Sequence, residues 1–292
     1  MKRLKLASLL TAALCLLCGC SSTAAPETSL SETLPPMTEA PDPALIYYAT
    51  DHGTTDPGEL TQFMGKLADT GYTVESDVLA QLPMNADAVV INSPQEDLTQ
   101  EDVEALDLYM DQGGHVLLLA PAFEGAVRFK YLGRFLEEYC IVMDDDRIRE
   151  TDKSRMLGEQ EDHILVDQIH APTGMTIVPE TAERPLYLHG ARSFRFAVMD
   201  NFDNVQQDLM LRTAASAVGE PCGGTSDDPV TYEGETLTTM LYSRDEARQN
   251  SFVVCVGAAD FLLDENFTRE ESLSAQDYVF AALAWAGNPI IF

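Results

Sequence analysis

The segment that decides the fold is ADAVVINSPQEDLTQEDVEALDLYMDQGGHVLLLAP, residues 86–121. Its two ends, 86–92 and 115–120, are nearly continuous apolar runs, which are typical of strands buried on both faces of a sheet. Between them, a helix is predicted to begin at the capping residue Thr99 and to end at Gly113-Gly114. The buried stripe of this helix recurs at helical spacing: Val103, Leu106 and Met110. The segment therefore predicts two parallel strands joined by a helix.

The same alternation of strand and helix continues on both sides of this segment. Further strands are predicted at 44–49, 72–74 and 251–257. Further helices are predicted from Asp56-Pro57 to Gly71, at 129–139 and at 275–286. In the last of these helices, Trp285 is expected to pack the helix against the sheet.

The middle of the chain is less regular. Residues 144–162 are acidic and weakly periodic, and the region after them holds short strand candidates at 163–166, 175–178, 193–198, 209–213 and 237–242. An antiparallel or irregular β-rich elaboration is therefore expected over about residues 144–245. Together with the flanking elements, it predicts a single α/β domain at 44–292, with a mostly parallel sheet covered by helices on both faces.

The first twenty residues have the features of an export signal. Three basic residues precede an uncharged apolar run, Leu6 to Leu17, which is too short to span a bilayer comfortably and fits the core of a secretory signal. The run ends in Leu17-Cys18-Gly19-Cys20, which is similar to a bacterial lipobox. That likeness implies that residues 1–19 are removed and that Cys20 is acylated. An ordinary signal peptide with a coincidental cysteine is the alternative.

Residues 20–43 are predicted to be a tether. Residues 21–43 are rich in Pro, Ser, Thr and Glu and have no apolar period, so they lack a core of their own. No later apolar run approaches 18 residues, and no membrane-spanning segment is therefore predicted beyond the signal. The lipid would hold the domain at the extracytoplasmic face of the cell membrane.

Composition narrows the classes of partner. The chain of 292 residues has 48 acidic and 18 basic residues, which gives a formal net charge of −30. Removal of residues 1–19 would take away three basic residues and no acidic one, so the folded part is more acidic than the whole chain. Such a surface repels polyphosphates and anionic lipids. A nucleic-acid partner is therefore excluded, and membrane attachment is expected through the lipid alone.

Three cysteines remain beyond the signal and Cys20: Cys140, Cys222 and Cys255. Three thiols cannot all pair within one chain. Cys140 follows a helical pattern and Cys255 lies inside an apolar strand, so both fit the role of small buried hydrophobic residues. Cys222 is expected in a loop. Free thiols are favoured, and a disulfide between Cys222 and either of the other two stays open.

Two patches of the chain resemble the GldG-like auxiliary family of ABC transporters. The first runs through residues 86–121, and the second joins Val253–Leu262 to the closing helix with Ala282-Leu283-Ala284-Trp285. The resemblance implies a three-layer fold like that of class I glutamine-amidotransferase or flavodoxin-like domains, and an accessory role beside a permease subunit. It carries over no catalytic residue. Members of that family are usually held by transmembrane helices or fused to a permease, whereas this chain has a predicted lipid anchor.

The sequence holds no recognisable motif for catalysis or for a cofactor. It lacks the nucleophile elbow Gly-x-Ser-x-Gly and the Gly-rich phosphate loops. Asp144-Asp145-Asp146 lacks the glycine and the terminal Glu of an EF-hand loop. Asp200, Asp203 and Asp208 could gather on Ca²⁺, although a solvated acidic face explains them as well. The five histidines are scattered with no His-x-x-x-His pair: His52, His115, His163, His170 and His189. No enzyme activity, cofactor or metal site is therefore predicted.

Any ligand site is expected at the carboxyl ends of the parallel strands, where open α/β sheets bind their ligands. The residues at these ends are Asp51, His52, Ser93, Pro121 and Asp260. Four of them are candidate ligand-binding residues: Asp51, His52, Ser93 and Asp260. The alternative is that Asp51 and Ser93 cap loops and helices and that Asp260 caps the turn that follows it.

Three functions remain open at this point. The first is a non-catalytic, membrane-anchored accessory lipoprotein of an ABC-type transport system. The second is a free-standing solute-binding lipoprotein, which would need a second lobe that residues 144–245 do not suggest. The third is a degenerate hydrolase on an amidotransferase-like scaffold, which would depend on Cys255 or Ser93.

Overall fold

The parallel half of the sheet consists of four mainly apolar strands that the sequence pattern predicts and one polar strand at its edge. The computed structural model describes residues 43–122, 129–177, 181, 183–197, 204–222 and 234–287. Five strands lie side by side, each parallel to its neighbours, in the order β2 (Thr73–Asp77), β1 (Leu45–Ala49), β3 (Ala88–Asn92), β4 (His115–Leu119) and β13 (Ser251–Val256). This is the 2-1-3-4-5 order of one class of doubly wound α/β sheet.

The same sheet continues in antiparallel pairing. Beyond β13 it adds β12 (Thr238–Asp245), β10 (Val205–Thr213), β7 (His163–Ile169) and β8 (Tyr187–His189). Two short strands join it at the side, β9 (Phe194–Phe196) and β5 (Ile141–Met143). A separate two-stranded sheet pairs β6 (Asp146–Glu150) with β11 (Ala217–Pro221). The fold is thus α/β with a large mixed sheet, half parallel and half antiparallel.

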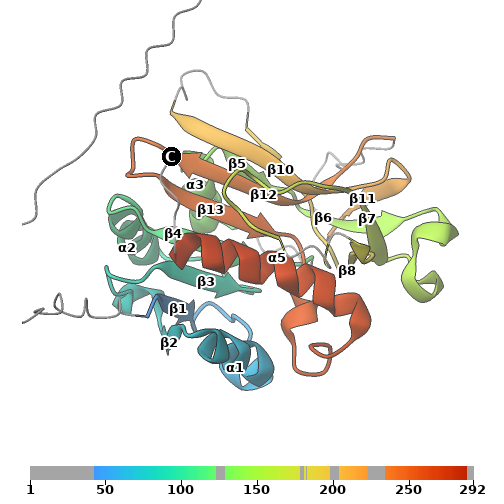
Figure 1. Cartoon of the computed structure of the whole chain (residues 1–292). Helices are drawn as coiled ribbons and strands as arrows, with labels where there is room; N and C mark the ends of the chain where they lie inside the picture. Colours follow the sequence, from blue (N-terminus) through green and yellow to red (C-terminus); the bar gives the residue numbers. More distant parts are fainter. Residues whose placement is uncertain are drawn as a thin grey trace, which may run out of the picture. The chain divides into compact units, whose positions relative to one another are not determined.

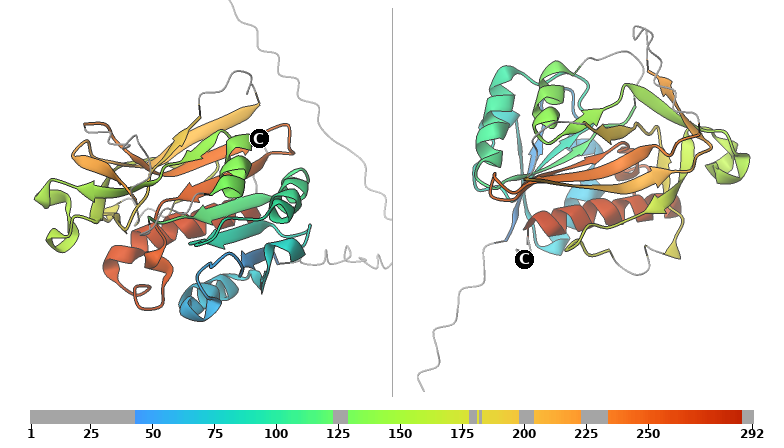
Figure 2. Two further views of the ribbon diagram at one scale, coloured as in Figure 1. Left: turned by 180° about the vertical axis from the view of Figure 1, so that it is seen from behind. Right: turned by 90° about the horizontal axis from the view of Figure 1, so that it is seen from above.

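Helices cover both faces of the parallel half (Figures 1 and 2). One face carries α1 (Thr61–Thr70) and α5 (Glu270–Gly287), and the other carries α2 (Gln100–Met110) and α3 (Lys130–Glu138). The described residues also contain five short 3-10 helices: η1 (Pro57–Glu59), η2 (Leu79–Gln81), η3 (Lys153–Arg155), η4 (Leu157–Glu159) and η5 (Asp260–Leu262). None of the helices in the described part of the chain has the length and apolar character needed to cross a membrane.

The two helical layers explain why four of the five parallel strands, β1, β3, β4 and β13, are mainly apolar and buried along their whole length. Strand β2, at the edge of the sheet, is polar and mostly exposed. In β1, Ile46 and Tyr48 enter the core under α1 and α5, whereas Leu45, Tyr47 and Ala49 enter the core under α2 and α3. Successive side chains of a strand point to opposite faces, so burial of both faces requires an unbroken apolar run. The expected α/β class, with strands buried on both faces, is confirmed.

Local signals set the ends of the helices. Thr99 caps the start of α2, as predicted, and it forms a reciprocal capping box with Asp102. Gly71 ends α1 in the left-handed conformation, with φ 103°. The start of α3 has no cap of its own, and its first backbone N–H groups are satisfied by the Asp97 carboxylate, which accepts from Lys130 at 2.7 Å and from Tyr131 at 2.9 Å. The sequence pattern does not reveal this distant cap.

Trp285 packs α5 against the sheet, as predicted. Its ring lies 4.9 Å from that of Phe252 in β13 and 4.7 Å from that of Tyr242 in β12, measured between centroids. The indole is almost fully buried. The single tryptophan therefore joins the closing helix to the junction between the parallel and antiparallel halves.

One strand candidate in the middle of the chain is wrong. Met175–Ile177 is not a strand, and Val178 lies outside the described residues. Residues 144–162, for which the sequence pattern indicated no particular strand, contain β6, η3 and η4, and β6 pairs antiparallel with β11. Strand β6 was not predicted because its sequence, DRIRE, is mostly charged. Its alternate residues are nevertheless buried against β11 and the rest of the domain.

The amino-terminal predictions concern residues that the structure does not describe. Residues 1–42 hold the expected signal, Cys20 and all but the last residue of the expected tether, and they lie outside the described ranges. The described residues of the folded unit begin at Pro43. The anchor therefore stays a prediction from sequence.

Candidate functional site

The predicted site residues follow the carboxyl ends of the parallel strands. Asp51 and His52 come directly after β1, Ser93 after β3, and Asp260 is the first residue of η5, shortly after β13. The structure does not bring all four together in one site. It places His52 in one cluster of titratable side chains and Asp260 in another.

The first cluster lies between two carboxylates. His52 Nε2 is 3.3 Å from Asp51 Oδ2 and 3.0 Å from Asp102 Oδ2, at ion-pair distance but outside hydrogen-bond geometry. Both carboxylates also accept backbone N–H groups, Asp51 Oδ2 from Leu79 at 3.0 Å and Asp102 Oδ2 from Thr99 at 2.8 Å. The cluster therefore links the loop after β1 to the starts of η2 and α2. One oxygen of each carboxylate already accepts a backbone N–H, whereas Asp51 Oδ1 is buried without a hydrogen-bond partner among the described residues.

The loop after β1 also fills the point where the strand order reverses, which is the usual ligand crevice of such sheets. The carbonyl of His52, which has φ 58°, accepts the N–H groups of Gln95 at 2.8 Å and Glu96 at 2.9 Å. A Cβ on Gly53 would lie 2.9 Å from Gln95 Cβ, so the two loops are in close contact.

Ser93 supports the turn after β3. Its N–H donates to Leu119 O at 2.7 Å, and its hydroxyl donates to Asn92 Oδ1 at 3.1 Å. For Asp51 and Ser93, the geometry favours the alternative in which both residues stabilise loops.

The second cluster is built around His189. Its Nδ1 lies 2.8 Å from Asp260 Oδ2, and its Nε2 lies 3.3 Å from Asp162 Oδ2. The His163 ring stands edge-on to it, with 4.1 Å between centroids. One nitrogen or carboxylate oxygen from each of Asp162, His163 and His189 lies within 4.8 Å of the other two. Asp260 thus binds a histidine and does not cap the turn that follows it.

The backbone holds these side chains together from three separate segments. His163 and His189 are directly opposite each other in the antiparallel pair β7–β8. The carbonyl of Asp162 accepts the N–H of Gly190 at 3.1 Å, which fixes the start of β7 beside the end of β8. A small open pocket of about 40 Å³, lined in part by His163, His189 and Asp260, borders the cluster. This volume accommodates about three water molecules.

The two imidazoles titrate in opposite directions. The pKa of His189 is raised, mainly by its hydrogen bond to Asp260 and further by the charges of Asp260 and Asp162. The pKa of His163 is lowered, mainly because burial removes its hydration and also because it faces His189. His189 therefore holds a proton between two carboxylates more readily than a free histidine does, whereas His163 loses its proton more readily.

Sequence reasoning missed three members of this cluster: Asp162, His163 and His189. The two histidines are 26 positions apart, with no motif spacing, and the strand that carries His189 was not predicted. Only the register of β7 against β8 brings them together. A correct prediction of the β7–β8 pairing would have revealed the cluster, because residues directly opposite each other in a sheet share one face.

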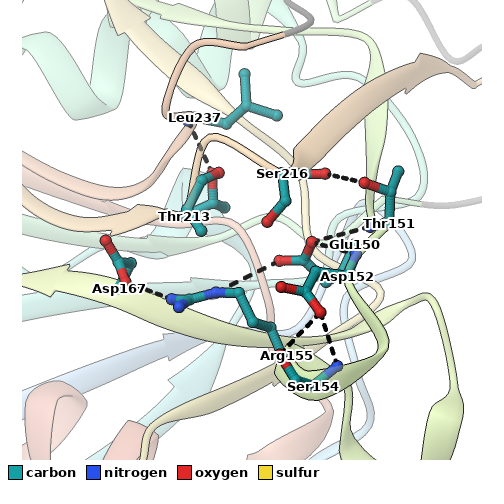
Figure 3. Close-up of polar contacts among 10 residues, drawn as sticks. Glu150, Thr151, Asp152, Ser154, Arg155, Asp167, Thr213, Ser216 and Leu237 are labelled. Atoms are coloured by element: carbon teal, nitrogen blue, oxygen red, sulfur yellow. Dashed lines mark hydrogen bonds and ion pairs between the residues drawn. The ribbon is translucent and has the colours of Figure 1, made fainter.

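Other buried acidic groups have structural partners. Figure 3 shows Glu150, whose Oε1 accepts the backbone N–H groups of Thr151 and Asp152, both at 2.9 Å. Its Oε2 lies 3.8 Å from Arg155 Nε, and the Arg155 guanidinium also pairs with Asp167. These contacts tie the end of β6 to η3 and β7.

The acidic run at 144–146 is also used within the fold. Asp146 accepts the N–H and the hydroxyl of Ser193, both at 2.8 Å, and Asp144 Oδ1 accepts from Arg195 Nε at 2.8 Å. Burial raises the pKa of Asp146 to about 6. Of the three aspartates considered for Ca²⁺, Asp200 and Asp203 lie outside the described residues, and Asp208 pairs with His170 at 2.9 Å.

The three described cysteines are free and buried: Cys140, Cys222 and Cys255. Burial is the largest influence on all three thiols, and it raises their pKa. The thiolate is the nucleophilic form of cysteine, so these environments disfavour it. Cys222 directly follows β11, and Cys255 lies within β13.

Comparison with known proteins gives a likeness in fold. No protein-family model and no curated protein sequence matches the chain. Among solved structures, the mmIFT52 N-terminal domain matches with a TM-score of 0.61 and 15% identity over 85% of this chain and 100% of that one. A protein described as ThuA-like from Bacteroides uniformis matches with a TM-score of 0.43 and 12% identity over 85% and 94%. A cytoplasmic protein from Salmonella typhimurium matches with a TM-score of 0.46 and 12% identity over 83% of this chain and 98% of that one. The first of these similarities supports a shared fold and carries no statement about activity.

Proposed function

We propose that the protein is a non-catalytic lipoprotein, held at the extracytoplasmic face of the cell membrane by an acylated Cys20, and that it serves as an accessory component of an ABC-type transport system. The observation that carries the proposal is the order of features at the amino terminus. A basic start, a short apolar run, the lipobox-like Leu17–Cys20 and a Pro/Ser/Thr/Glu-rich tether precede the folded unit. Each feature suits a domain that is attached to a membrane by lipid.

The transport role draws on the two patches that resemble the GldG-like family. The first patch supplies β3, α2 and β4, and the second supplies β13 and η5. Strands β3, β4 and β13 are consecutive neighbours in the sheet, although the two patches are more than 130 residues apart in sequence. The resemblance therefore concerns one continuous part of the fold. Together with the strand order of the sheet and its two helical layers, this resemblance supports a class I amidotransferase-like or flavodoxin-like domain.

The non-catalytic part of the proposal draws on the surroundings of the candidate nucleophiles. Cys255 is completely buried inside β13, and the Ser93 hydroxyl donates within its own turn. The histidine nearest the strand switch, His52, is held between two carboxylates that cap backbone groups. These environments suit a domain that makes contacts with a partner more than one that turns over a substrate.

The anchor is tested by expressing the full-length chain in a bacterial host and following incorporation of a labelled palmitate. We expect label in the wild type, none in Cys20→Ser, and undiminished label in Cys15→Ser, which removes a thiol from the same segment. Fractionation should place the wild type in membranes, and protease should reach it in spheroplasts. Label retained by Cys20→Ser, or a wild type without label, would contradict the anchor.

The transport role is tested in the native cell. Gently solubilised membranes should yield an ATPase or a permease subunit together with the wild type. The same detergent extract from cells that produce Cys20→Ser should yield much less of it, because that protein leaves the membrane. A lipidated protein that brings down no transporter component would overturn the partnership and leave the free-standing solute-binding alternative.

A further inference from the structure

We infer that Asp162, His163 and His189 form a binding site for a divalent transition metal of the zinc class, with Asp260 as the positioning residue for His189. The sequence predicted no metal site, because these residues follow no motif spacing. The inference depends on the contacts of the cluster alone and does not require the transport role.

The donor set matches the chemistry of zinc. Two imidazole nitrogens and one carboxylate oxygen are ligands that Zn²⁺ accepts, whereas Mg²⁺ and Ca²⁺ prefer sites made of oxygen alone. With metal–ligand bonds of about 2.0–2.1 Å, neighbouring ligands of a tetrahedral ion lie about 3.3 Å apart. His189 Nε2 and Asp162 Oδ2 are separated by 3.3 Å. That spacing is longer than the 2.7–2.9 Å typical of a charge-assisted hydrogen bond.

Asp260 determines which nitrogen of His189 is available. The 2.8 Å contact from Nδ1 to Asp260 Oδ2 is a hydrogen bond in which Nδ1–H donates to the carboxylate. The proton is thereby kept on Nδ1, and Nε2 is directed toward Asp162 and away from Asp260. Carboxylate, histidine and metal are arranged in this way in many zinc sites, where the second carboxylate orients the ring and makes the nitrogen a stronger ligand.

A divalent ion placed between His189 Nε2 and Asp162 Oδ2, which lie 3.3 Å apart, would bind both atoms. The His163 ring stands edge-on to His189, with 4.1 Å between centroids. One nitrogen of His163 lies within 4.8 Å of the ligand atoms of His189 and Asp162, so His163 can supply the third ligand. The Asp260 carboxylate contacts the other nitrogen of His189 and adds a second negative charge beside the site.

The site is held in place before a metal binds. The two histidines are fixed by the β7–β8 register, and Asp162 by the bond from Gly190 N–H to its carbonyl. The side chains of Asp162 and His189 are 40% and 42% exposed, so an ion can enter from solvent. The adjoining pocket of about 40 Å³ leaves room for water as a fourth ligand. Three protein ligands and one open position give an accessible site.

The His52 cluster does not compete for this assignment. It also places three ligand atoms within 4.8 Å of one another. It has a single imidazole, however, and both of its carboxylates already accept backbone N–H groups, from Leu79 and Thr99. A metal bound by Asp51 Oδ2 and Asp102 Oδ2 would share these ligand atoms with contacts that hold η2 and α2.

The test measures zinc binding to the full-length protein by calorimetry and by metal analysis after dialysis. The variants are His189→Ala, His163→Ala and Asp260→Asn. The matched control is His170→Ala, which removes another exposed histidine paired with an aspartate, Asp208, at 2.9 Å. We expect one equivalent of Zn²⁺ that is lost, or weakened at least tenfold, in both ligand variants. Asp260→Asn should weaken zinc binding by about 10- to 100-fold. His170→Ala should bind zinc as the wild type does.

Two further measurements separate a built site from general attraction to an acidic surface. Millimolar Mg²⁺ should leave zinc binding unchanged, and Co²⁺ should give the visible absorption of a four-coordinate ion in the wild type but not in His189→Ala. Circular dichroism and melting curves check that each variant is folded. Zinc binding that survives in both His163→Ala and His189→Ala, or that Mg²⁺ abolishes, overturns the inference. So does a Co²⁺ spectrum that matches the hydrated ion.

Discussion

The Asp146→Asn substitution tests whether a carboxyl group buried in β6 titrates within the folded protein. Asp146 has no exposed surface, and its oxygens accept the N–H and the hydroxyl of Ser193. Burial is the main reason why its pKa rises to about 6, and the nearby Asp144 carboxylate acts in the same direction. Asparagine keeps the shape of the side chain, accepts the same N–H and donates to the same hydroxyl, but it does not titrate.

The magnitude follows from the displacement of the pKa. A rise from 3.8 to about 6 corresponds to roughly 3 kcal/mol, at about 1.4 kcal/mol per pKa unit. The folded protein holds this proton more tightly than the unfolded chain does. The contribution is therefore fully present below about pH 3.8 and is lost as the pH rises through about 6. Relative to Asp146→Asn, the wild type should lose stability over that window.

The assay is urea denaturation of the wild type, Asp146→Asn and Asp145→Asn. The neighbour Asp145 is exposed, so its substitution removes the same formal charge without the buried carboxyl group. Because the pI is near 4.2, solubility restricts the measurement to about pH 5 to 7. In that interval the same arithmetic leaves roughly 1.3 kcal/mol. Asp145→Asn should follow the wild type, whereas Asp146→Asn should gain this amount relative to both. Parallel pH profiles for all three proteins would refute the reasoning.

Three further predictions concern stability and are checked by denaturant unfolding. Tyr109→Phe should cost roughly 1–3 kcal/mol, because the buried Tyr109 hydroxyl joins two backbone segments with contacts of 3.0–3.2 Å. Gly257→Ala should lower stability, since its Cβ would lie 2.0 Å from Arg192 O, whereas Gly65→Ala meets no atom within 4 Å and should add about 0.5–1 kcal/mol. Asp97→Ala should cost roughly 0.5–2 kcal/mol by uncapping α3. Equal stabilities of the two glycine variants, or a neutral Asp97→Ala, would contradict these contacts.

The parallel half of the fold could be predicted because its signals are local. In residues 86–121, each strand is an unbroken apolar run, and the helix between them has its own cap and its own glycine stop. The decisive interactions are only a few residues apart in sequence, so the pattern itself carries them. The same holds for Gly71 at the end of α1, whose left-handed backbone strongly favours glycine.

The antiparallel strands, in the large sheet and in the separate β6–β11 pair, were less predictable because they depend on distant partners. Strand β8 has three residues and β6 is mostly charged, so neither shows an apolar period of its own. Each is defined by the strand that it pairs with, β7 or β11. The cap of α3 could not be predicted for the same reason, because Asp97 lies more than thirty residues before the helix that it caps.

This contrast also explains which candidate residues the structure leaves available for binding. The strand-end rule selected Asp51, His52 and Ser93, whose polar atoms largely serve loops. The Ser93 hydroxyl donates to the adjacent Asn92, whereas Asp51 accepts from Leu79, 28 positions further along the chain. The rule also selected Asp260, which has no such local role and instead reaches His189 across 71 positions. Nε2 of His189 and the carboxylate of Asp162 then face one another without a backbone donor between them. In this chain, the ligand atoms that stay available for a metal come from distant segments that the sheet topology brings together. A search for motifs along the sequence therefore does not find them.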